Sequence, residues 1–488
     1  MLEKLKLSTE TRRDAALALG ALAGGALLGW LTVAPHLQSP ALVARLGGYV
    51  LPVAFAAFLV ALSLHRPVAA VALWLLAAPY SRYAGLDFSF GAGVPDVTLT
   101  RWFVAWLMLL LAVQAARGRR RLDRLTAADA AYLLFAVAMF VSAPRSHWGA
   151  VTALQAVFDV YLVPFLALYA LRQLVADRRD LGLIALALLL MGMGLAFLVI
   201  REQVTGEVLF YAKQSLPYSR SFRKVVSLMG NAAPMGVTAA LTLALPLMLA
   251  AQAFRSRRWA ALALLAVGLG FVAVGAFMTY NRASWLGLVV TLATFVVLRP
   301  AARRLLLPPL AVAGVLAALF WSSLVSSPVV TERLLEERSV DYRTTAAELS
   351  VAIAQQEPLL GVGFSNFGVE AARRYGWDPA GRLDQWAAAH NSYLYVLVSA
   401  GLLAFLPYAA WIALLAWGWL QRWRRGLTEP NGLLREGLLD ALAAGLAMFL
   451  TYFLASATFD NAETPIMNLV FYVGWGAVWG ATRGLGRR

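Results

Sequence analysis

The run LGLIALALLLMGMGLAFLVI, residues 181–200, decides the fold of this chain. It contains neither a charged residue nor a proline, and an α-helix of about 20 apolar residues spans the roughly 30 Å hydrocarbon core of a bilayer. The run therefore predicts a transmembrane helix. Similar runs recur along the 488 residues, of which 61% are hydrophobic and 14% charged, and the mean hydropathy is +0.69. This composition excludes a soluble globular domain and indicates an integral membrane protein.

The apolar runs predict an all-α, polytopic membrane protein with about 14 transmembrane helices and a large helical loop before the third-last helix. The expected spans are 14–34, 46–64, 67–80, 98–115, 127–143, 150–171, 181–200, 231–253, 259–277, 282–298, 305–323, 392–420, 437–457 and 464–482. Whether region 46–80 holds two helices or one that hydropathy splits is open. We expect three parts: N-terminal transmembrane helices over 1–323 with an outer segment 201–230, a loop over 324–391, and C-terminal transmembrane helices over 392–488.

The cations predict the orientation of the chain. Of the 42 lysines and arginines, 26 lie on the side of the two termini, 5 lie in the short connections of the opposite side, and 11 lie in the segments 201–230 and 324–391. Cytoplasmic loops are rich in Lys and Arg, so both termini are expected in the cytoplasm. Both long segments are then expected on the opposite, outer side of the membrane. The net charge of +16 is then a topology signal that also favours anionic inner-leaflet lipids, and no nucleic acid partner is expected.

The sequence predicts neither a metal site nor a cofactor. The chain has no cysteine, which excludes disulfides and thiol ligands. The outer segments hold no D-x-D pair, and the adjacent Glu336 and Glu337 diverge by about 100° if they are helical. The four histidines lie in separate connections: His36, His65, His147 and His390.

Two groups of ionisable residues are candidates for function. Arg220, Arg223 and Lys224 stand at i, i+3 and i+4, so on a helix they share one face, which suits either a phosphate or pyrophosphate or an anchor to lipid headgroups. Asp159 lies within an expected span, where a carboxylate is costly and is a functional candidate by default. It keeps a transporter or lipid flippase open as an alternative.

Three motifs resemble one known family. TYNRASWLG at 279–287, DYRTTAAELSVAIAQQEPLLGVGFSNFG at 341–368 and AHNSYLYVLVSAGLLAF at 389–405 are together similar to the O-antigen ligase and O-antigen polymerase family of polytopic glycosyltransferases. The resemblance implies transfer of a saccharide from undecaprenyl pyrophosphate to a hydroxyl of a glycan or glycolipid, in lipopolysaccharide or other cell-envelope polysaccharide biosynthesis. It places the reaction on the periplasmic face of the bacterial inner membrane.

The resemblance also assigns the site. The essential histidine of the family falls on His390, followed by Asn391, and its two arginines fall on Arg282 and Arg343. Asn281 and Asn391 are expected to orient substrate, although Asn391 fits equally the N-cap of the next helix. Arg220, Arg223 and Lys224 are added to the pyrophosphate-binding set by location alone.

The chemistry independently requires these residue types. A sugar pyrophosphate carries its own leaving group, so the enzyme needs a base for the acceptor hydroxyl and positive charge for the departing pyrophosphate. Histidine, with an ordinary pKa of about 6.5, serves as a base, whereas arginine keeps its proton and serves as a charge clamp. The expected reaction is metal-independent and inverts the glycosidic carbon. Gly361 and Gly363 are expected to permit a turn rather than to bind phosphate.

The sequence leaves the acceptor open. A ligase passes a finished chain to an acceptor such as lipid A core, whereas a polymerase joins repeat units, and both share these motifs. We favour the ligase, although the high span count leans toward the polymerase. A transporter is disfavoured because we find no repeated halves and because the ionisable residues gather at the outer edge.

Overall fold

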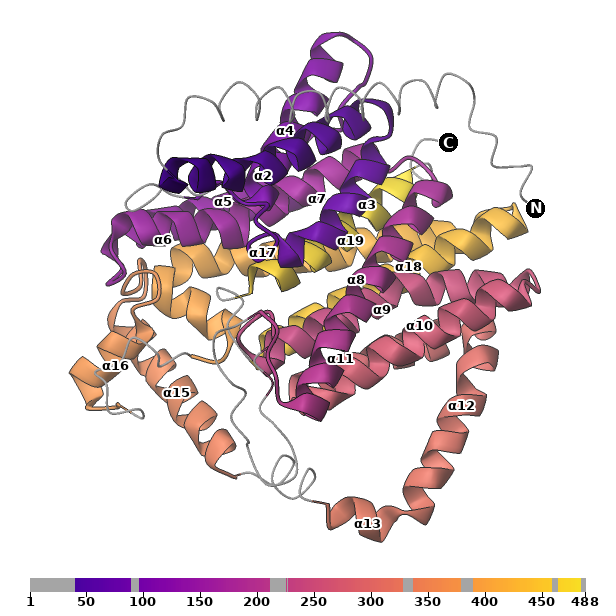
Figure 1. The fold of residues 1–488 in the computed structure, drawn as a ribbon. Helices are drawn as coiled ribbons and strands as arrows, with labels where there is room; N and C mark the ends of the chain where they lie inside the picture. The colour runs from indigo at the N-terminus through magenta and orange to yellow at the C-terminus, as the bar shows by residue number, and fades with distance from the viewer. Residues whose placement is uncertain are drawn as a thin grey trace. The chain divides into compact units, whose positions relative to one another are not determined.

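The computed structural model describes residues 40–88, 96–210, 225, 227–327, 337–378, 389–458 and 464–483 (Figure 1). Helices joined by turns make up these residues, and the one extended pairing among them is an isolated bridge between Phe88 and Val97. The predicted all-α class is confirmed. The chain packs as two compact units, Met1–Arg120 and Arg121–Arg488.

The first unit contains α2 (Pro40–His65), α3 (Pro67–Ala77) and α4 (Leu99–Ala116). Region 46–80 thus forms two helices, and the break lies at Arg66, whose backbone is not helical (φ −137°, ψ 74°). Proline follows it at the first position of α3, where its missing N–H has no helical partner to lose.

The second unit contains most of the helices. They are α5 (Ala127–Ser142), α6 (Ala150–Val157), α7 (Val163–Leu174), α8 (Arg178–Thr205), α9 (Ala232–Arg255), α10 (Trp259–Met278), α11 (Arg282–Leu298), α12 (Pro300–Leu319), α13 (Trp321–Val325), α15 (Glu337–Gln356), α16 (Phe367–Tyr375), α17 (Ser392–Leu427), α18 (Gly432–Ser456) and α19 (Pro465–Ala481). The run 181–200 lies within α8, as expected.

Nine helical stretches in the described residues are long and apolar enough to cross a membrane. They are α4, α5 with its following turn, α6 to α7, α8, α9, α10, α12, α17 and α18, and three shorter apolar helices cover Val50–His65, Pro67–Tyr80 and Arg282–Leu298. The run 14–34 lies outside the described residues. The count of fourteen therefore stays a prediction, whereas a multi-pass membrane protein is supported.

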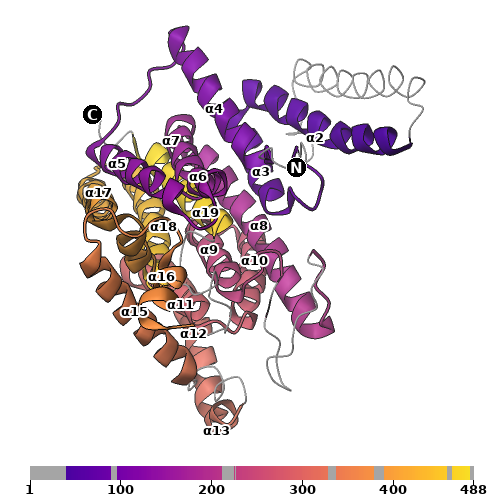
Figure 2. The ribbon, with the colours of Figure 1, turned by 90° about the vertical axis from the view of Figure 1, so that its left-hand side faces the viewer.

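Helices α9 and α18 form the centre of the second unit (Figures 1 and 2). Of the residues in the most apolar part of each, 83% are buried inside the protein, against 6% for α12. In α12 only Ala302 is buried, and Figure 1 shows this helix running away from the others toward α13. The central helices therefore set the positions of the remaining elements.

Helix α18 runs antiparallel to α9, α11 and α17. Near its C-terminus, Thr451 Oγ1 lies 2.9 Å from Thr291 Oγ1 of α11, and the carbonyl of Phe453 accepts a hydrogen bond from the Tyr393 hydroxyl of α17 at 2.7 Å. Near its N-terminus, the Leu442 carbonyl accepts from the Trp419 indole at the far end of α17. Helices α11 and α17 consequently begin where α18 ends.

The start of α9 lies at the same place, because a side chain at Gly236 would collide with Ser284 of α11. We call this end of the unit, near Ser456, the His390 end, and the opposite end the Asp440 end. At the Asp440 end, the fully buried Asp440 carboxylate accepts from Arg299 Nε at 2.7 Å and from Arg255 Nη1 at 3.2 Å. These ion pairs join the end of α9 and the start of α12 to α18.

Candidate active site

His390 lies immediately before α17, in an unusual backbone conformation. Its φ is +48°, a left-handed value that costs a non-glycine residue roughly 1–2 kcal/mol. The side chain is half-buried, and the preceding Ala389 is buried. Left-handed residues of this kind persist only where the surrounding structure holds them, and they cluster at functional sites. The backbone itself therefore marks His390 as a candidate.

An aromatic group from the loop lies against His390. The Tyr342 ring of α15 meets the imidazole edge to face, with ring centroids 5.2 Å apart. Trp377 is 5.0 Å from Tyr342 and 5.9 Å from Phe367 of α16. Helix α15, which ends at Gln356 shortly before Pro358, thus packs beside the candidate base.

Arg343 follows Tyr342 on α15 and is half-buried. The structure therefore brings the backbone of this predicted pyrophosphate ligand next to a residue that contacts His390. Nothing in the spacing of the sequence connects the two motifs, which lie 47 positions apart.

Asn391 is the N-cap of α17. Its Oδ1 accepts from the backbone N–H groups of Tyr393 at 3.0 Å and Leu394 at 3.2 Å. Of the two roles that the sequence leaves open for Asn391, capping is thus present in the structure.

The start of α11 repeats this arrangement. Tyr280 has φ +48°, Asn281 Oδ1 caps the helix by accepting from Ala283 N at 2.9 Å, and the half-buried Arg282 is the first helical residue. Burial raises the pKa of the Tyr280 phenol further above neutral pH. Both motifs therefore build a left-handed residue, an asparagine cap and a helix start.

The starts of α9, α11 and α17 meet at the His390 end. Asn231 caps α9 by accepting from Ala233 N at 3.0 Å, so all three helices begin with an asparagine cap. Each helix N-terminus carries about half a positive charge. The C-terminus of α18 at the same end carries about half a negative charge, so the helix starts and Arg282 favour an anion that lies directly at those starts.

Arg282 and His390 reach this end by way of α18. Gly287 of α11 packs against Thr451, since an added Cβ would lie 3.0 Å from that side chain, and Tyr393 of α17 bonds to Phe453. Arg282 precedes Gly287 by about one and a half helical turns, and His390 precedes Tyr393 by less than one. Both residues therefore lie near the last turns of α18.

Other predicted residues stand apart from this arrangement. Arg220, Arg223 and Lys224 lie outside the described residues. Asp159 lies in a π-helical turn, Phe158–Leu162, between α6 and α7. The carbonyl of Val160 in that turn accepts from Asn468 Nδ2 at 3.2 Å, so a buried side-chain amide of α19 provides a hydrogen-bond partner for one backbone carbonyl of the turn.

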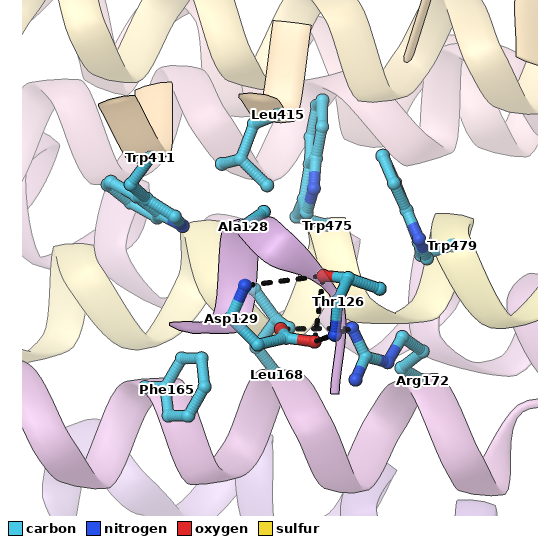
Figure 3. A pocket seen from close by; sticks show the side chains of 10 residues that line it. All are labelled: Thr126, Ala128, Asp129, Phe165, Leu168, Arg172, Trp411, Leu415, Trp475 and Trp479. Carbon is cyan, nitrogen blue, oxygen red and sulfur yellow. Dashed lines mark hydrogen bonds and ion pairs between the residues drawn. The ribbon is translucent and has the colours of Figure 1, made fainter. Parts of the chain in front are cut away.

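Within the described residues, no group of three or more His, Cys, Asp or Glu side chains is arranged to hold a metal ion. A pocket lies between α5, α7, α17 and α19 (Figure 3). Figure 3 shows the Arg172 guanidinium against the Asp129 carboxylate in this pocket, and Nη1 and Oδ2 are 2.9 Å apart. The residues that line the pocket include none of the predicted site residues.

Sequence reasoning missed the aromatic neighbours. Tyr342 lies inside a quoted motif, directly before Arg343, yet nothing in its spacing indicates a contact with His390. Tyr280 likewise precedes Asn281, and its left-handed backbone has no sequence signal because tyrosine does not favour that conformation.

The family comparison covers this same part of the chain. Residues 267–409 match the model of a family described as O-antigen ligase. The match begins within α10 and ends within α17, so it contains Arg282, Arg343 and His390. No curated protein matches the chain.

Proposed function

Because residues 267–409 match the O-antigen ligase family model, we propose that this chain is a member of the O-antigen ligase and polymerase family and a membrane glycosyltransferase acting on a lipid-linked saccharide. The donor is a saccharide on undecaprenyl pyrophosphate, and the acceptor is a hydroxyl of lipid A core or of a similar glycolipid. The observation that carries the proposal is that Arg282 and His390, both inside the matched range, stand at helix starts at the same end of the bundle.

His390 is the general base in this proposal. The imidazole takes the proton of the acceptor hydroxyl while the acceptor oxygen forms a bond to the glycosidic carbon. The bond from that carbon to the pyrophosphate oxygen breaks on the opposite side, so the configuration inverts. The bond electrons leave with undecaprenyl pyrophosphate.

The arginines stabilise the departing charge. Arg282 stands at the start of α11, where the helix dipole adds to its own charge, and its planar guanidinium can bind two phosphate oxygens at once. Arg343 on α15 joins it from the loop. Three further cations complete the proposed pyrophosphate set: Arg220, Arg223 and Lys224.

Asn281 and Asn391 would orient substrate through their Nδ2 groups, since Oδ1 of each caps its helix. The positive-inside pattern supports a bacterial inner membrane location with both termini cytoplasmic. The His390 end and the loop 324–391 would then face the periplasm, within a chain of about 14 spans.

The first experiment separates ligase from polymerase. Purified protein is incubated with an undecaprenyl-pyrophosphate saccharide, with and without lipid A core, beside a His390→Ala control. A ligase yields product only when the core is added. A His390-dependent ladder from donor alone means a polymerase, and donor that crosses a vesicle membrane without any new glycosidic bond means a transporter.

A further inference from the structure

Helix α17 is interrupted at Gly401. In a continuous helix, Leu402 N would donate to the carbonyl of Val398 and Leu403 N to that of Ser399. Gly401 has φ 64° and ψ −163°, which separates residues 392–400 from 402–427. Two donors and two acceptors are thereby left without their helical partners, in a part of the protein where an unsatisfied backbone group is costly.

The turn that follows α15 takes up all four groups. Its hydrogen bonds to the broken ends of α17 are Leu402 N to Pro358 O (2.8 Å), Leu403 N to Leu359 O (3.2 Å), Val362 N to Val398 O (2.8 Å) and Gly363 N to Ser399 O (3.0 Å). Residues 358–363, which we call the inserted turn, thus occupy a gap in the hydrogen-bond ladder of α17.

Two glycines make the insertion possible. A Cβ on Gly361 would lie 2.3 Å from the Val398 carbonyl oxygen, and a Cβ on Gly401 would lie 2.3 Å from the Leu359 carbonyl. Both residues have positive φ, +61° and +64°, which glycine adopts without a steric penalty. The backbones approach too closely for any other residue at either position.

Residues 145–147, between α5 and α6, hold the inserted turn from the other side. Arg145 donates from Nη1 to Gly361 O at 2.8 Å and from Nη2 to Leu360 O at 2.6 Å. Asn366, 8% exposed, donates from Nδ2 to Val362 O at 2.9 Å and to Arg145 O at 2.7 Å. Its Oδ1 accepts from His147 N at 2.8 Å.

We infer that Arg145 and Asn366 are positioning residues for His390. The break at Gly401 removes the helical coupling between 392–400 and the rest of α17. The short first segment, which His390 directly precedes, is therefore held near its start by the Tyr393 bond to Phe453 and near its end, at Val398 and Ser399, by the inserted turn, which Arg145 and Asn366 hold in turn. A catalytic consequence rests on the proposed function, whereas the positional statement does not.

The positional test uses the absence of cysteine from the chain. His390→Cys places a single thiol, whose labelling rate by a membrane-impermeant maleimide reports its exposure. Adding Asn366→Ala or Arg145→Gln should change the rate severalfold. Adding Arg373→Gln, at an arginine of α16 whose side chain is 65% exposed, should leave it unchanged. Unchanged rates in both turn variants would overturn the inference, and Arg145→Lys replaces Arg145→Gln if the latter does not fold.

The catalytic test measures transfer in the otherwise wild-type protein. Asn366→Ala and Arg145→Gln should lower kcat about a hundredfold, because displacement of a reacting group by about 1 Å can cost that much, while KM for the donor stays constant. In a His390→Ala background the same changes should cause no further loss. A further loss there would assign the two residues a merely structural role. If the wild type transfers no saccharide, the proposed function fails, and the labelling rates still decide the positioning.

Discussion

At the scale of single residues, His390 and Tyr280 share the same local backbone arrangement. Each has φ +48° and precedes an asparagine that caps the next helix. Positive φ is uncommon in non-glycine residues, although histidine adopts it more often than tyrosine, so the flanking structure holds it at an expense of roughly 1–2 kcal/mol. This arrangement places the neighbouring residues at a helix N-terminus, where negative charge is favoured.

His390→Ala should lower saccharide transfer by about a hundredfold to ten-thousandfold, the usual contribution of a general base. The matched control is His65→Ala, an exposed histidine at the end of α2, which should transfer like the wild type. Product formation from a labelled donor measures both. Normal transfer by His390→Ala would remove the base assignment.

Arg282→Lys should lower kcat/KM by about tenfold to a hundredfold, because lysine keeps the charge but loses the planar fork that binds two oxygens. Arg304→Lys, at an exposed arginine of α12, is the control for the same exchange. Initial rates at varied donor concentration measure the effect. Equal rates in both variants would argue against a bidentate pyrophosphate clamp.

At the scale of elements, the break in α17 matters most. A helix of 36 residues is longer than the about 20 needed to cross the hydrocarbon, and the inserted turn enters it seven to twelve residues after the cap. Irregular backbone at such a depth is tolerated only where protein buries it. Gly361 and Gly363 are buried, whereas Pro358, Leu359 and Leu360 are exposed. The condition is met by hydrogen bonds, because α17, Arg145 and Asn366 accept from or donate to the backbone of the turn.

Gly401→Ala should therefore destabilise the protein, since its methyl group would meet the Leu359 carbonyl. Gly270→Ala in α10 is the control. No atom lies within 4 Å of its added Cβ, so the change should be neutral or stabilise by up to about 1 kcal/mol through helix propensity. Thermal unfolding in detergent compares the two. An unchanged Tm for Gly401→Ala would show that the inserted turn can shift to accommodate the methyl group without a loss of stability.

The stability of the short helix α16 should depend on pH. Burial of Glu370 acts to raise its pKa, but hydrogen bonds from Arg373 and Arg374 outweigh burial and leave the pKa below its ordinary value. The unfolded state therefore takes up the proton first as pH falls. The stabilisation is complete above the ordinary pKa of 4.5 and is lost as pH falls through the lowered pKa. Amide exchange in α16 should accelerate in that window, and Glu370→Gln should abolish the dependence.

At the scale of the whole molecule, the two ends of the bundle differ in how they treat charge. The Asp440 end pairs its arginines with acids inside the protein, since Arg299 and Arg255 share Asp440 and Arg172 pairs with Asp129. The His390 end gathers helix N-termini, Arg282 and Arg343. One end is thus built for stability, and the other is suited to an anionic ligand.

Asp440→Asn should lower the free energy of unfolding by up to about 3–5 kcal/mol, because it removes the fully buried carboxylate that Arg255 and Arg299 share and leaves the buried Arg299 with Glu436 alone. Asp177→Asn is the control, since Asp177 caps α8 and asparagine caps a helix equally well. Chemical denaturation in detergent measures both. Equal midpoints would mean that other groups compensate the arginines.

The sequence by itself determined the all-α class, the multi-pass membrane character, the resemblance of three motifs to the O-antigen ligase and polymerase family, and the N-cap at Asn391. Span length and asparagine before a helix are local signals, which explains why 181–200 and the start of α17 could be predicted. The number of spans, the membrane orientation and the pyrophosphate-binding role of Arg220, Arg223 and Lys224 stay predictions.

Only the tertiary structure decided how the site is assembled. The inserted turn bonds to residues about 40 positions further along the chain, and Arg282 and His390, 108 positions apart, meet the same end of α18. Such contacts leave no periodic trace in the sequence, because each depends on where separate helices pack rather than on the preference of any one segment.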